Sequence, residues 1–318
     1  MPLTRNTASK AIWYLAAALL WVAPVSVQAA SASQAQRDLF KQVYADVERG
    51  NWASVEALSP ARRAALEDYV LYPDLRAAWF RATIKNADHG EIEEFLTRHG
   101  VLKPARELRY RYALHLAAIG DLDEYLSIYE QYYQGLDVAR LDCLALQAEL
   151  DAGRTSRVVY RAIDLWTVGE SQVDECDPVF EFLNDGNHLG VAEYMRRFDL
   201  AIDAREFSMA QWLGKSIDQN HIDVAAQWIN AQRNPERFVR DYRKLANNPG
   251  SNRQIAYALE RITYDDPELA LQLFEPIVRG KRFSAELEFR TARHIALWTA
   301  RDNLPRGYEL LTQLPAAA

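Results

Sequence analysis

The chain contains an internal repeat, and this repeat constrains the fold more than any other feature of the sequence. Residues 110–121 (YRYALHLAAIGD) align with residues 143–154 (CLALQAELDAGR), so that Gly120 and Gly153 are separated by 33 residues. This period is typical of helix-turn-helix repeats. In each copy we expect one helix to end at the glycine, which can adopt a left-handed conformation, and a second amphipathic helix to follow. The repeat therefore predicts stacked helical hairpins.

The rest of the sequence has the same character. The chain has only 13 glycines and 12 prolines, and it lacks the alternating β-branched runs that are typical of strands. Before Pro73, Tyr72 is expected to leave the helical region and to form a turn. Apolar periodicity and Gly, Asn or Pro turns predict helices over residues 34–49, 52–58, 84–100, 104–120, 122–133, 191–200, 206–215, 222–231, 235–245, 254–263, 267–278, 284–300 and 305–314.

No segment has the composition of a flexible linker, so we predict one continuous domain over residues 30–318. Because each hairpin buries its apolar face only against its neighbours, such an array curves into a solenoid. The predicted fold is therefore all-α, a right-handed superhelical solenoid of TPR-like helical hairpins. The eight tryptophans and sixteen tyrosines are expected to pack between repeats; a sugar-stacking platform would require several of them to share an exposed face.

The first residues have the pattern of a secretory signal peptide. A short basic segment precedes an apolar run over residues 11–25, and Val27-Gln28-Ala29 supplies small residues for a cleavage site. An uncleaved membrane anchor would need roughly 20 apolar residues, whereas this run is shorter and contains Pro24. We therefore predict that residues 1–29 are removed on export and that no membrane span remains.

The two cysteines, Cys143 and Cys176, lie one repeat length apart. In an exported protein such a pair most simply forms a disulfide, which here would join two neighbouring hairpins. Closing a loop of this length would stabilise the fold by roughly 3–4 kcal/mol in the chain-entropy model. The alternative, a redox or metal-binding thiol pair, lacks both a CxxC spacing and a nearby histidine pair.

Charge and motif content exclude several classes of function. The net charge is −7, and loss of residues 1–29 would remove two basic and no acidic residues and leave −9. Nucleic-acid phosphates would repel such a chain. The six histidines have no zinc-binding spacing, and neither a Gly-rich phosphate loop nor a G-x-S-x-G nucleophile elbow is present. We therefore expect no metal, no cofactor and no nucleic-acid partner.

Two stretches resemble a known family. Residues 68–75 (DYVLYPDL) resemble a D-Y-x-L-Y-P-x-L element, and residues 165–180 (LWTVGESQVDECDPVF) resemble an L-W-x-x-G-x-S-Q-x-x-x-C-D-x-x-F element. Both elements are typical of the soluble lytic murein transglycosylases, periplasmic enzymes of Gram-negative bacteria. In that family the cysteine matching Cys176 is bonded to the one matching Cys143, so the resemblance implies the same disulfide and a periplasmic location.

The resemblance also implies a superhelical scaffold, on which family members mount a separate lysozyme-like catalytic domain. That domain cleaves the β-1,4 bond between N-acetylmuramic acid and N-acetylglucosamine and leaves a 1,6-anhydro end, with one glutamate acting as acid and then as base. Its signature is Glu-Ser followed by an aromatic residue. Here Glu170-Ser171 is followed by Gln172 and matches a scaffold position. We therefore predict that this chain contains no catalytic residue and is inactive alone.

Two hypotheses of different classes follow. The first is the scaffold portion of a periplasmic lytic transglycosylase, either a truncated product or a fragment of a longer reading frame, which contacts peptidoglycan glycan strands. The second is a stand-alone periplasmic helical-repeat adaptor that binds a protein partner through its concave face. The two family elements favour the first hypothesis. The sequence does not identify the residues that would contact a glycan.

Overall fold

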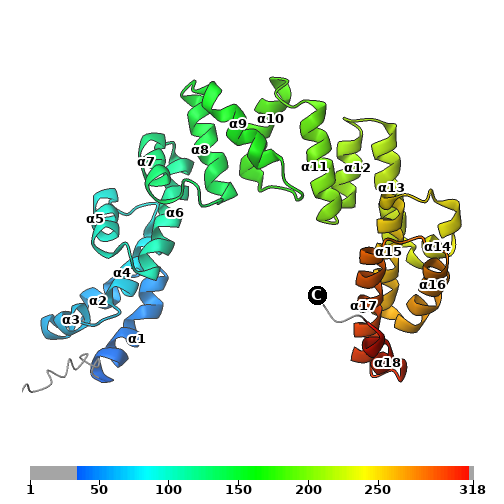
Figure 1. Cartoon of the computed structure of the whole chain (residues 1–318). Coiled ribbons are helices and arrows are strands. Elements are labelled where there is room, and N and C mark those ends of the chain that lie inside the picture. Colours follow the sequence, from blue (N-terminus) through cyan, green and yellow to red (C-terminus); the bar gives the residue numbers. More distant parts are fainter. Residues whose placement is uncertain (1–33, 315–318) are drawn as a thin grey trace, which may run out of the picture. The chain divides into compact units, whose positions relative to one another are not determined.

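The computed structural model describes residues 34–314 of the 318-residue chain. These residues form 18 α-helices and two short 3₁₀ helices, and no strand occurs among them (Figure 1). The all-α prediction is therefore confirmed. The predicted signal peptide, residues 1–29, lies outside the described residues and stays a prediction.

The chain divides into two compact units, which meet between Tyr112 and Ala113 within helix α6 (Lys103–Ile119). The part of each unit that the structure describes covers residues 34–112 and 113–314, here called the N-terminal and the C-terminal unit. The sequence predicts one continuous domain over residues 30–318, and this stays a prediction. Each unit is described by itself below.

The N-terminal unit packs short helices around a small apolar core. Its first helix contacts the next three, and its buried side chains include Val47, Leu66 and Leu75, none of which is measurably exposed. Besides the first part of α6, its helices are α1 (Gln34–Glu48), α2 (Ala53–Glu56), α3 (Pro60–Glu67), α4 (Tyr72–Thr83) and α5 (His89–His99).

Two boundaries in this unit differ from the sequence prediction. The prediction that Tyr72 lies in a turn is wrong, because α4 begins at Tyr72 with Pro73 in its first turn. Proline is tolerated there, since the first N–H groups of a helix need no intrahelical partner. The helix predicted from residue 84 begins only at His89, because the Asp88 side chain accepts a hydrogen bond from the backbone N–H of Glu91 and caps it.

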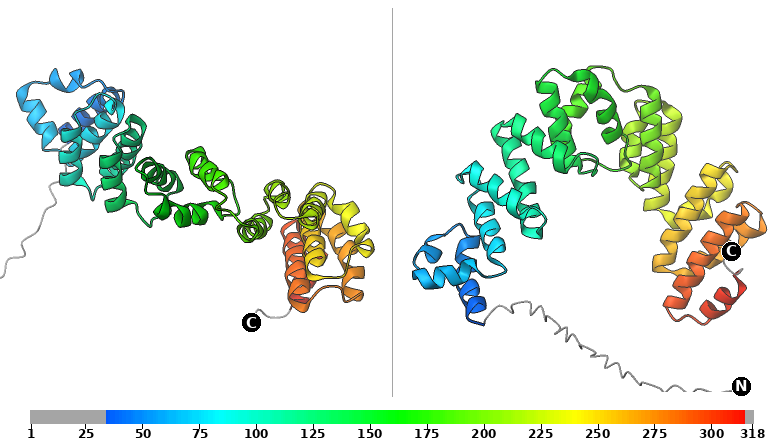
Figure 2. Two further views of the ribbon diagram at one scale, coloured as in Figure 1. Left: turned by 90° about the horizontal axis from the view of Figure 1, so that it is seen from above. Right: turned by 60° about the vertical axis from the view of Figure 1, so that its left-hand side comes forward.

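The C-terminal unit stacks helices in chain order, as the views in Figure 2 show. Its long helix α15 is the most buried element and contacts α13, α14, α16 and α17. One apolar cluster runs from α8 to α17. The helices that follow α6 are α7 (Leu122–Tyr132), α8 (Ala139–Asp151), α9 (Thr155–Trp166), η1 (Asp174–Cys176), α10 (Asp177–Asp185), α11 (Val191–Asp203), α12 (Phe207–Gly214), α13 (Gln219–Arg233), α14 (Pro235–Arg240), η2 (Tyr242–Lys244), α15 (Pro249–Asp265), α16 (Pro267–Arg279), α17 (Ala285–Arg301) and α18 (Arg306–Gln313).

The internal repeat has the predicted local structure. Gly120 and Gly153 follow the ends of α6 and α8 with φ of 79° and 73°, in the left-handed region that favours glycine. A Cβ at either position would meet no neighbouring atom, so the conformation rather than crowding explains the glycine. In both copies a second helix begins within two residues, which completes the predicted hairpin.

The predicted disulfide is confirmed. Cys143 in α8 is bonded to Cys176 at the end of η1, with their Cα atoms 4.9 Å apart and both residues fully buried. The bond joins α8 to the segment that leads directly into α10. It therefore connects two successive hairpins of the C-terminal unit, one repeat length apart.

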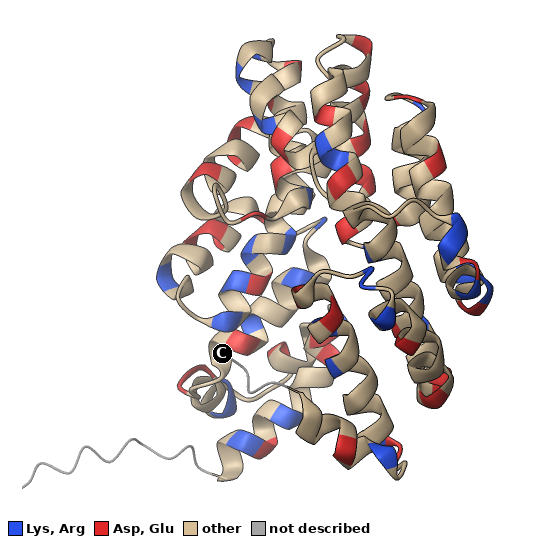
Figure 3. Ribbon diagram, turned by 45° about the vertical axis from the view of Figure 1, so that its right-hand side comes forward, with Lys and Arg blue, Asp and Glu red and all other residues tan. Residues whose placement is uncertain are grey.

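Charged side chains of both signs are interspersed over the helices of both units (Figure 3). Many of their ion pairs are exposed, such as that between Arg98 and Glu94, and such pairs contribute at most about 1 kcal/mol each. In the part of the chain that the structure describes, no helix has both the length and the apolar character needed to cross a membrane.

Candidate functional site

A polar pocket lies beside the disulfide in the C-terminal unit, and we call it the Tyr129 pocket. Its volume is about 540 Å³. It is formed by α7, α8, α9 and the segments that follow α7 and α9. The side chains that matter for its chemistry are Tyr129, Asp142, Arg161 and Gln172.

A chain of hydrogen bonds organises this pocket. The Tyr129 hydroxyl donates to Asp142 Oδ1 at 2.6 Å and accepts from Arg161 Nη2 at 2.8 Å. The other terminal nitrogen of Arg161 donates to Glu149 Oε1 at 2.9 Å. Four side chains from three consecutive helices are therefore held in one network, and Tyr129 is its centre.

Burial shifts the acid–base properties of two members of this network. It raises the pKa of the Tyr129 hydroxyl, and the hydrogen bond to Asp142 raises it further. Burial also raises the pKa of the Asp142 carboxyl, although the Tyr129 hydroxyl and the Arg161 guanidinium act in the opposite direction. The network therefore favours a protonated tyrosine beside a carboxyl group that is harder to ionise than usual.

This arrangement can hold a ligand that carries hydroxyl or amine groups. Asp137 and Asp164 also line the pocket, so its lining has three carboxyl groups and one guanidinium, which already pairs with Glu149. Carboxylates accept hydrogen bonds from hydroxyl and ammonium groups. Because Asp142 Oδ1 already accepts a hydrogen bond from the Tyr129 hydroxyl, the pocket is organised for binding more than for proton transfer.

The sequence element at residues 165–180 forms one wall of the Tyr129 pocket and joins it to α11. Gln172 Nε2 donates to the backbone carbonyl of Leu165 at 3.1 Å and closes the intervening loop. Trp166 is buried, and the guanidinium of Arg197 lies 4.5 Å from its ring centroid. Such a cation–π contact is worth about 2 kcal/mol when both groups are desolvated.

Gly169 shows why this element requires a glycine. A Cβ at this position would lie 2.5 Å from the backbone oxygen of Leu200 and 2.9 Å from the Cβ of Ala204. The loop after α9 therefore passes directly over α11, and only glycine permits this approach. The residues that carry the family resemblance here make structural contacts.

The element at residues 68–75 is structural as well. Tyr69 is buried with its ring edge against Phe40, at 5.4 Å between centroids, and Leu75 is fully buried. One turn later, the guanidinium of Arg76 lies 4.6 Å from the ring of Phe80 and Arg76 Nη2 is paired with Glu91 at 3.2 Å. These contacts connect α4 to its neighbours in the N-terminal unit.

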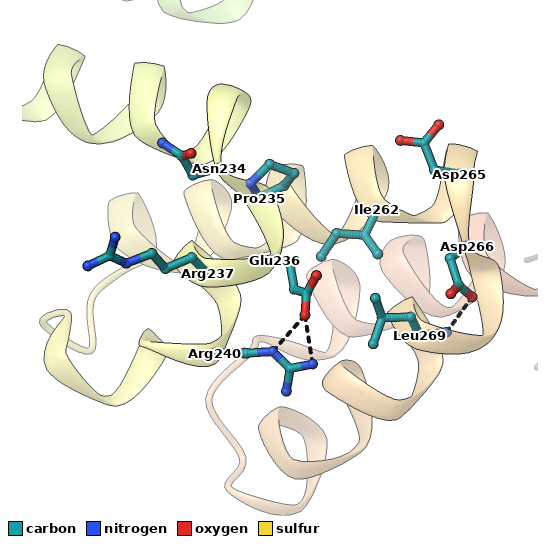
Figure 4. A pocket seen from close by; sticks show the side chains of 9 residues that line it. All are labelled: Asn234, Pro235, Glu236, Arg237, Arg240, Ile262, Asp265, Asp266 and Leu269. Carbon is teal, nitrogen blue, oxygen red and sulfur yellow. Dashed lines mark hydrogen bonds and ion pairs between the residues drawn. The ribbon is translucent and has the colours of Figure 1, made fainter.

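A second pocket of the C-terminal unit, with a volume of about 500 Å³, lies between α14, α15 and α16 (Figure 4). Three of its charged groups already have hydrogen-bond partners. Glu236 Oε1 accepts from Arg240 Nε at 2.8 Å, and Asp266 Oδ1 accepts from the backbone N–H of Leu269 at 2.9 Å. The latter bond makes Asp266 the N-cap of α16, directly before Pro267.

The residues that the sequence singled out for chemistry do not converge in the described structure. Glu170 and Ser171 are exposed on the loop after α9, and no group of His, Cys, Asp or Glu between residues 34 and 314 could hold a metal ion. Sequence reasoning missed Tyr129, Asp142 and Arg161. Their positions follow no local motif, and only the packing of three helices brings them together.

The described chain thus defines a class: an all-α helical-repeat protein, cross-linked by one disulfide. No known protein-family model matches it. It is 23% identical over 297 residues to a soluble lytic murein transglycosylase of Escherichia coli K12, a match that covers 93% of this chain and 45% of the relative.

Solved structures of lytic transglycosylases are similar to this chain as well. The structure of an inactive mutant of the lytic transglycosylase Slt from Pseudomonas aeruginosa is 30% identical, with a TM-score of 0.56 and coverage of 87% of this chain and 44% of that one. The 70-kDa soluble lytic transglycosylase of Escherichia coli has the same fold, with a TM-score of 0.62 at 19% identity. The chain is therefore similar to soluble lytic murein transglycosylases, and it spans slightly less than half the length of those that it matches.

Proposed function

We propose that this chain is the superhelical scaffold portion of a periplasmic soluble lytic murein transglycosylase and that it contacts peptidoglycan glycan strands during cell-wall turnover. One observation carries the proposal: the relatives match 93% of this chain, while the chain accounts for 45% of the relative's length. The two sequence elements that resemble the family support it, because their side chains make buried contacts that define how successive helices pack.

In this proposal the chain does not cleave glycosidic bonds by itself. Cleavage of the MurNAc–GlcNAc bond requires a carboxylic acid with a raised pKa beside the leaving oxygen. Within the described residues, burial raises the pKa of two carboxyl groups, Asp74 and Asp142. Asp74 lies in the first turn of α4, and Asp142 is held by Tyr129. Neither has the local sequence of the family's catalytic glutamate.

Co-sedimentation with murein sacculi tests the proposed contact with glycan strands. The purified exported chain is mixed with sacculi or with chitin, which lacks lactyl groups and peptides, and the protein left in the supernatant is measured. We expect depletion by sacculi that exceeds depletion by chitin. Equal retention on both polymers, or none on either, would contradict the proposal and would favour the adaptor hypothesis, in which the partner is a protein.

A further inference from the structure

Four pockets of the described residues differ in the sign of their charge. The pocket of Figure 4 and the Tyr129 pocket each have more carboxyl groups than arginines. A third, beside Tyr72, has two arginines and two glutamates that pair with each other. The fourth has two arginines, Arg253 and Arg290, and one carboxyl group, Glu286. Among these four pockets it is the one whose lining has more arginines than carboxyl groups, and one of its two arginines, Arg253, is paired with Asp203 outside the lining.

We call the fourth cavity the Arg290 pocket. Its volume is about 440 Å³, and it lies where the first turns of α15 and α17 face each other. Besides the charged groups, it is lined by amide and hydroxyl side chains that include Asn247, Asn248 and Ser284. Its size falls within the range of about 300–1,000 Å³ that is typical of small-ligand sites.

A buried polar cluster makes one side of this pocket rigid. Asn252 is almost fully buried, and its Nδ2 donates to the backbone carbonyl of Arg282 at 2.8 Å and to Asn247 Oδ1 at 3.2 Å. In return Arg282 Nε donates to Asn252 Oδ1 at 2.8 Å, and its Nη2 donates to the carbonyl of Ala246 at 2.6 Å. The segment that carries Asn247 and Asn248 is therefore fixed before any ligand binds, which reduces the entropy cost of binding.

Only one of the two arginines of the pocket forms an ion pair in the described structure. Arg253 Nη2 is held by Asp203 Oδ1 at 2.6 Å. Arg290 is exposed and belongs to none of the ion pairs of the described residues. Its guanidinium is therefore available for an anionic group, and guanidinium–carboxylate pairs are among the strongest charge-assisted hydrogen bonds. Glu286 lies one helical turn before Arg290 on α17, and its negative charge would repel an anionic ligand.

We propose that the Arg290 pocket binds a carboxylate of a short peptide attached to a glycan, as in the peptide stems of peptidoglycan, with Arg290 pairing with the carboxylate. The asparagine side chains supply the donors and acceptors that peptide amides need. This inference rests on the proposed function and adds a ligand class to it. It separates two contacts of the scaffold: one with the sugar chain, and one with the peptide.

Isothermal titration calorimetry on the exported chain tests this inference. The probe is a disaccharide-tetrapeptide released from murein, and the comparison ligand is the disaccharide of N-acetylglucosamine from chitin, which carries neither a peptide nor a carboxylate. We expect the first to bind more tightly than the second. Arg290→Ala should weaken binding of the disaccharide-tetrapeptide by about tenfold or more. The matched control, Arg157→Ala, removes an exposed arginine of α9 and should leave the affinity unchanged.

A third variant gives a change of opposite sign. Glu286→Gln removes the carboxylate that opposes the ligand and should tighten binding by about two- to fivefold. Equal affinity for the two ligands, or equal effects of the Arg290 and Arg157 variants, would overturn the inference, and so would weaker binding by Glu286→Gln.

If the parent chain sediments with sacculi while its variants at Arg290 and Arg157 bind the probe alike, the pocket is refuted and the proposed function stands. If the probe binds as predicted but sacculi do not retain the chain, the proposed function fails instead.

Discussion

The disulfide between Cys143 and Cys176 offers a quantitative test of the repeat architecture. Replacement of either cysteine by alanine opens the same covalent loop, so the two substitutions share one energetic cause. The chain-entropy model assigns a loop of 33 residues an entropy of about 12.5 cal/mol/K, or about 3.7 kcal/mol at 25 °C. Both residues are fully buried, and each lost sulfur should add a packing cost of about 1 kcal/mol.

The model therefore predicts strong non-additivity. Cys143→Ala and Cys176→Ala should each lower the free energy of unfolding by about 4.7 kcal/mol, whereas the double variant should lose only about 5.7 kcal/mol. The coupling energy from the double-mutant cycle is then about 3.7 kcal/mol, which is the contribution of the bond itself.

Urea unfolding of residues 30–318, followed by circular dichroism and by tryptophan fluorescence, supplies the four free energies. The parent protein in reductant serves as a control and should lose only about 3.7 kcal/mol, because it lacks the bond but keeps both sulfur atoms. A coupling energy below about 1 kcal/mol would refute the claim that the bond stabilises the junction of two hairpins by closing a loop. Two reactive thiols in the unfolded, unreduced protein would refute the bond itself.

Three further predictions concern the Tyr129 pocket and its wall. Tyr129→Phe leaves Asp142 and Arg161 without the bridging hydroxyl and should cost about 1–3 kcal/mol in urea unfolding, whereas Tyr160→Phe at an exposed position of the neighbouring helix should cost less than about 0.5 kcal/mol. Because burial raises the pKa of Asp142, its contribution to stability is fully present below the ordinary pKa of 3.8 and is lost as pH rises through the folded pKa. The parent protein should therefore gain stability relative to Asp142→Asn as pH falls from neutral towards 4, and a flat or opposite difference in thermal unfolding would contradict this. Gly169→Ala places a Cβ 2.5 Å from the Leu200 oxygen and should lower the free energy of unfolding by about 1–3 kcal/mol; an unchanged value would show that the loop can move away from α11.

Local signals in the sequence were sufficient for much of the fold. Gly120, Gly153 and Asp266 mark helix ends and starts through the conformational freedom of glycine and the capping ability of a carboxylate. The disulfide between Cys143 and Cys176 could be predicted from the repeat length together with the expected export. The start of α4 at Tyr72 could not be predicted. A residue before proline disfavours the helical conformation, but a helix tolerates proline in its first turn, and tertiary packing decides which effect prevails.

The polar sites could not be predicted from the sequence. The partners of Tyr129 in its network are 13 and 32 residues away. The side chains of the Arg290 pocket come from α15, α17 and the residues just before each of these helices, with α16 between them in the sequence. No motif describes such sets, because each depends on how helices from different hairpins stack. Sequence reasoning gives the class of fold and the positions of turns, while the sites arise only from the packing.

The products released from murein sacculi test the central claim most directly. A protein of residues 30–318 is incubated with sacculi beside a lysozyme-type control, and the soluble fraction is analysed by mass spectrometry. If the chain is the proposed scaffold portion, it should by itself remain on the sacculi and release no 1,6-anhydro muropeptides. Release of 1,6-anhydro muropeptides by the chain alone would contradict the account, because the glycosidic acid would then lie within a chain that we propose contains none.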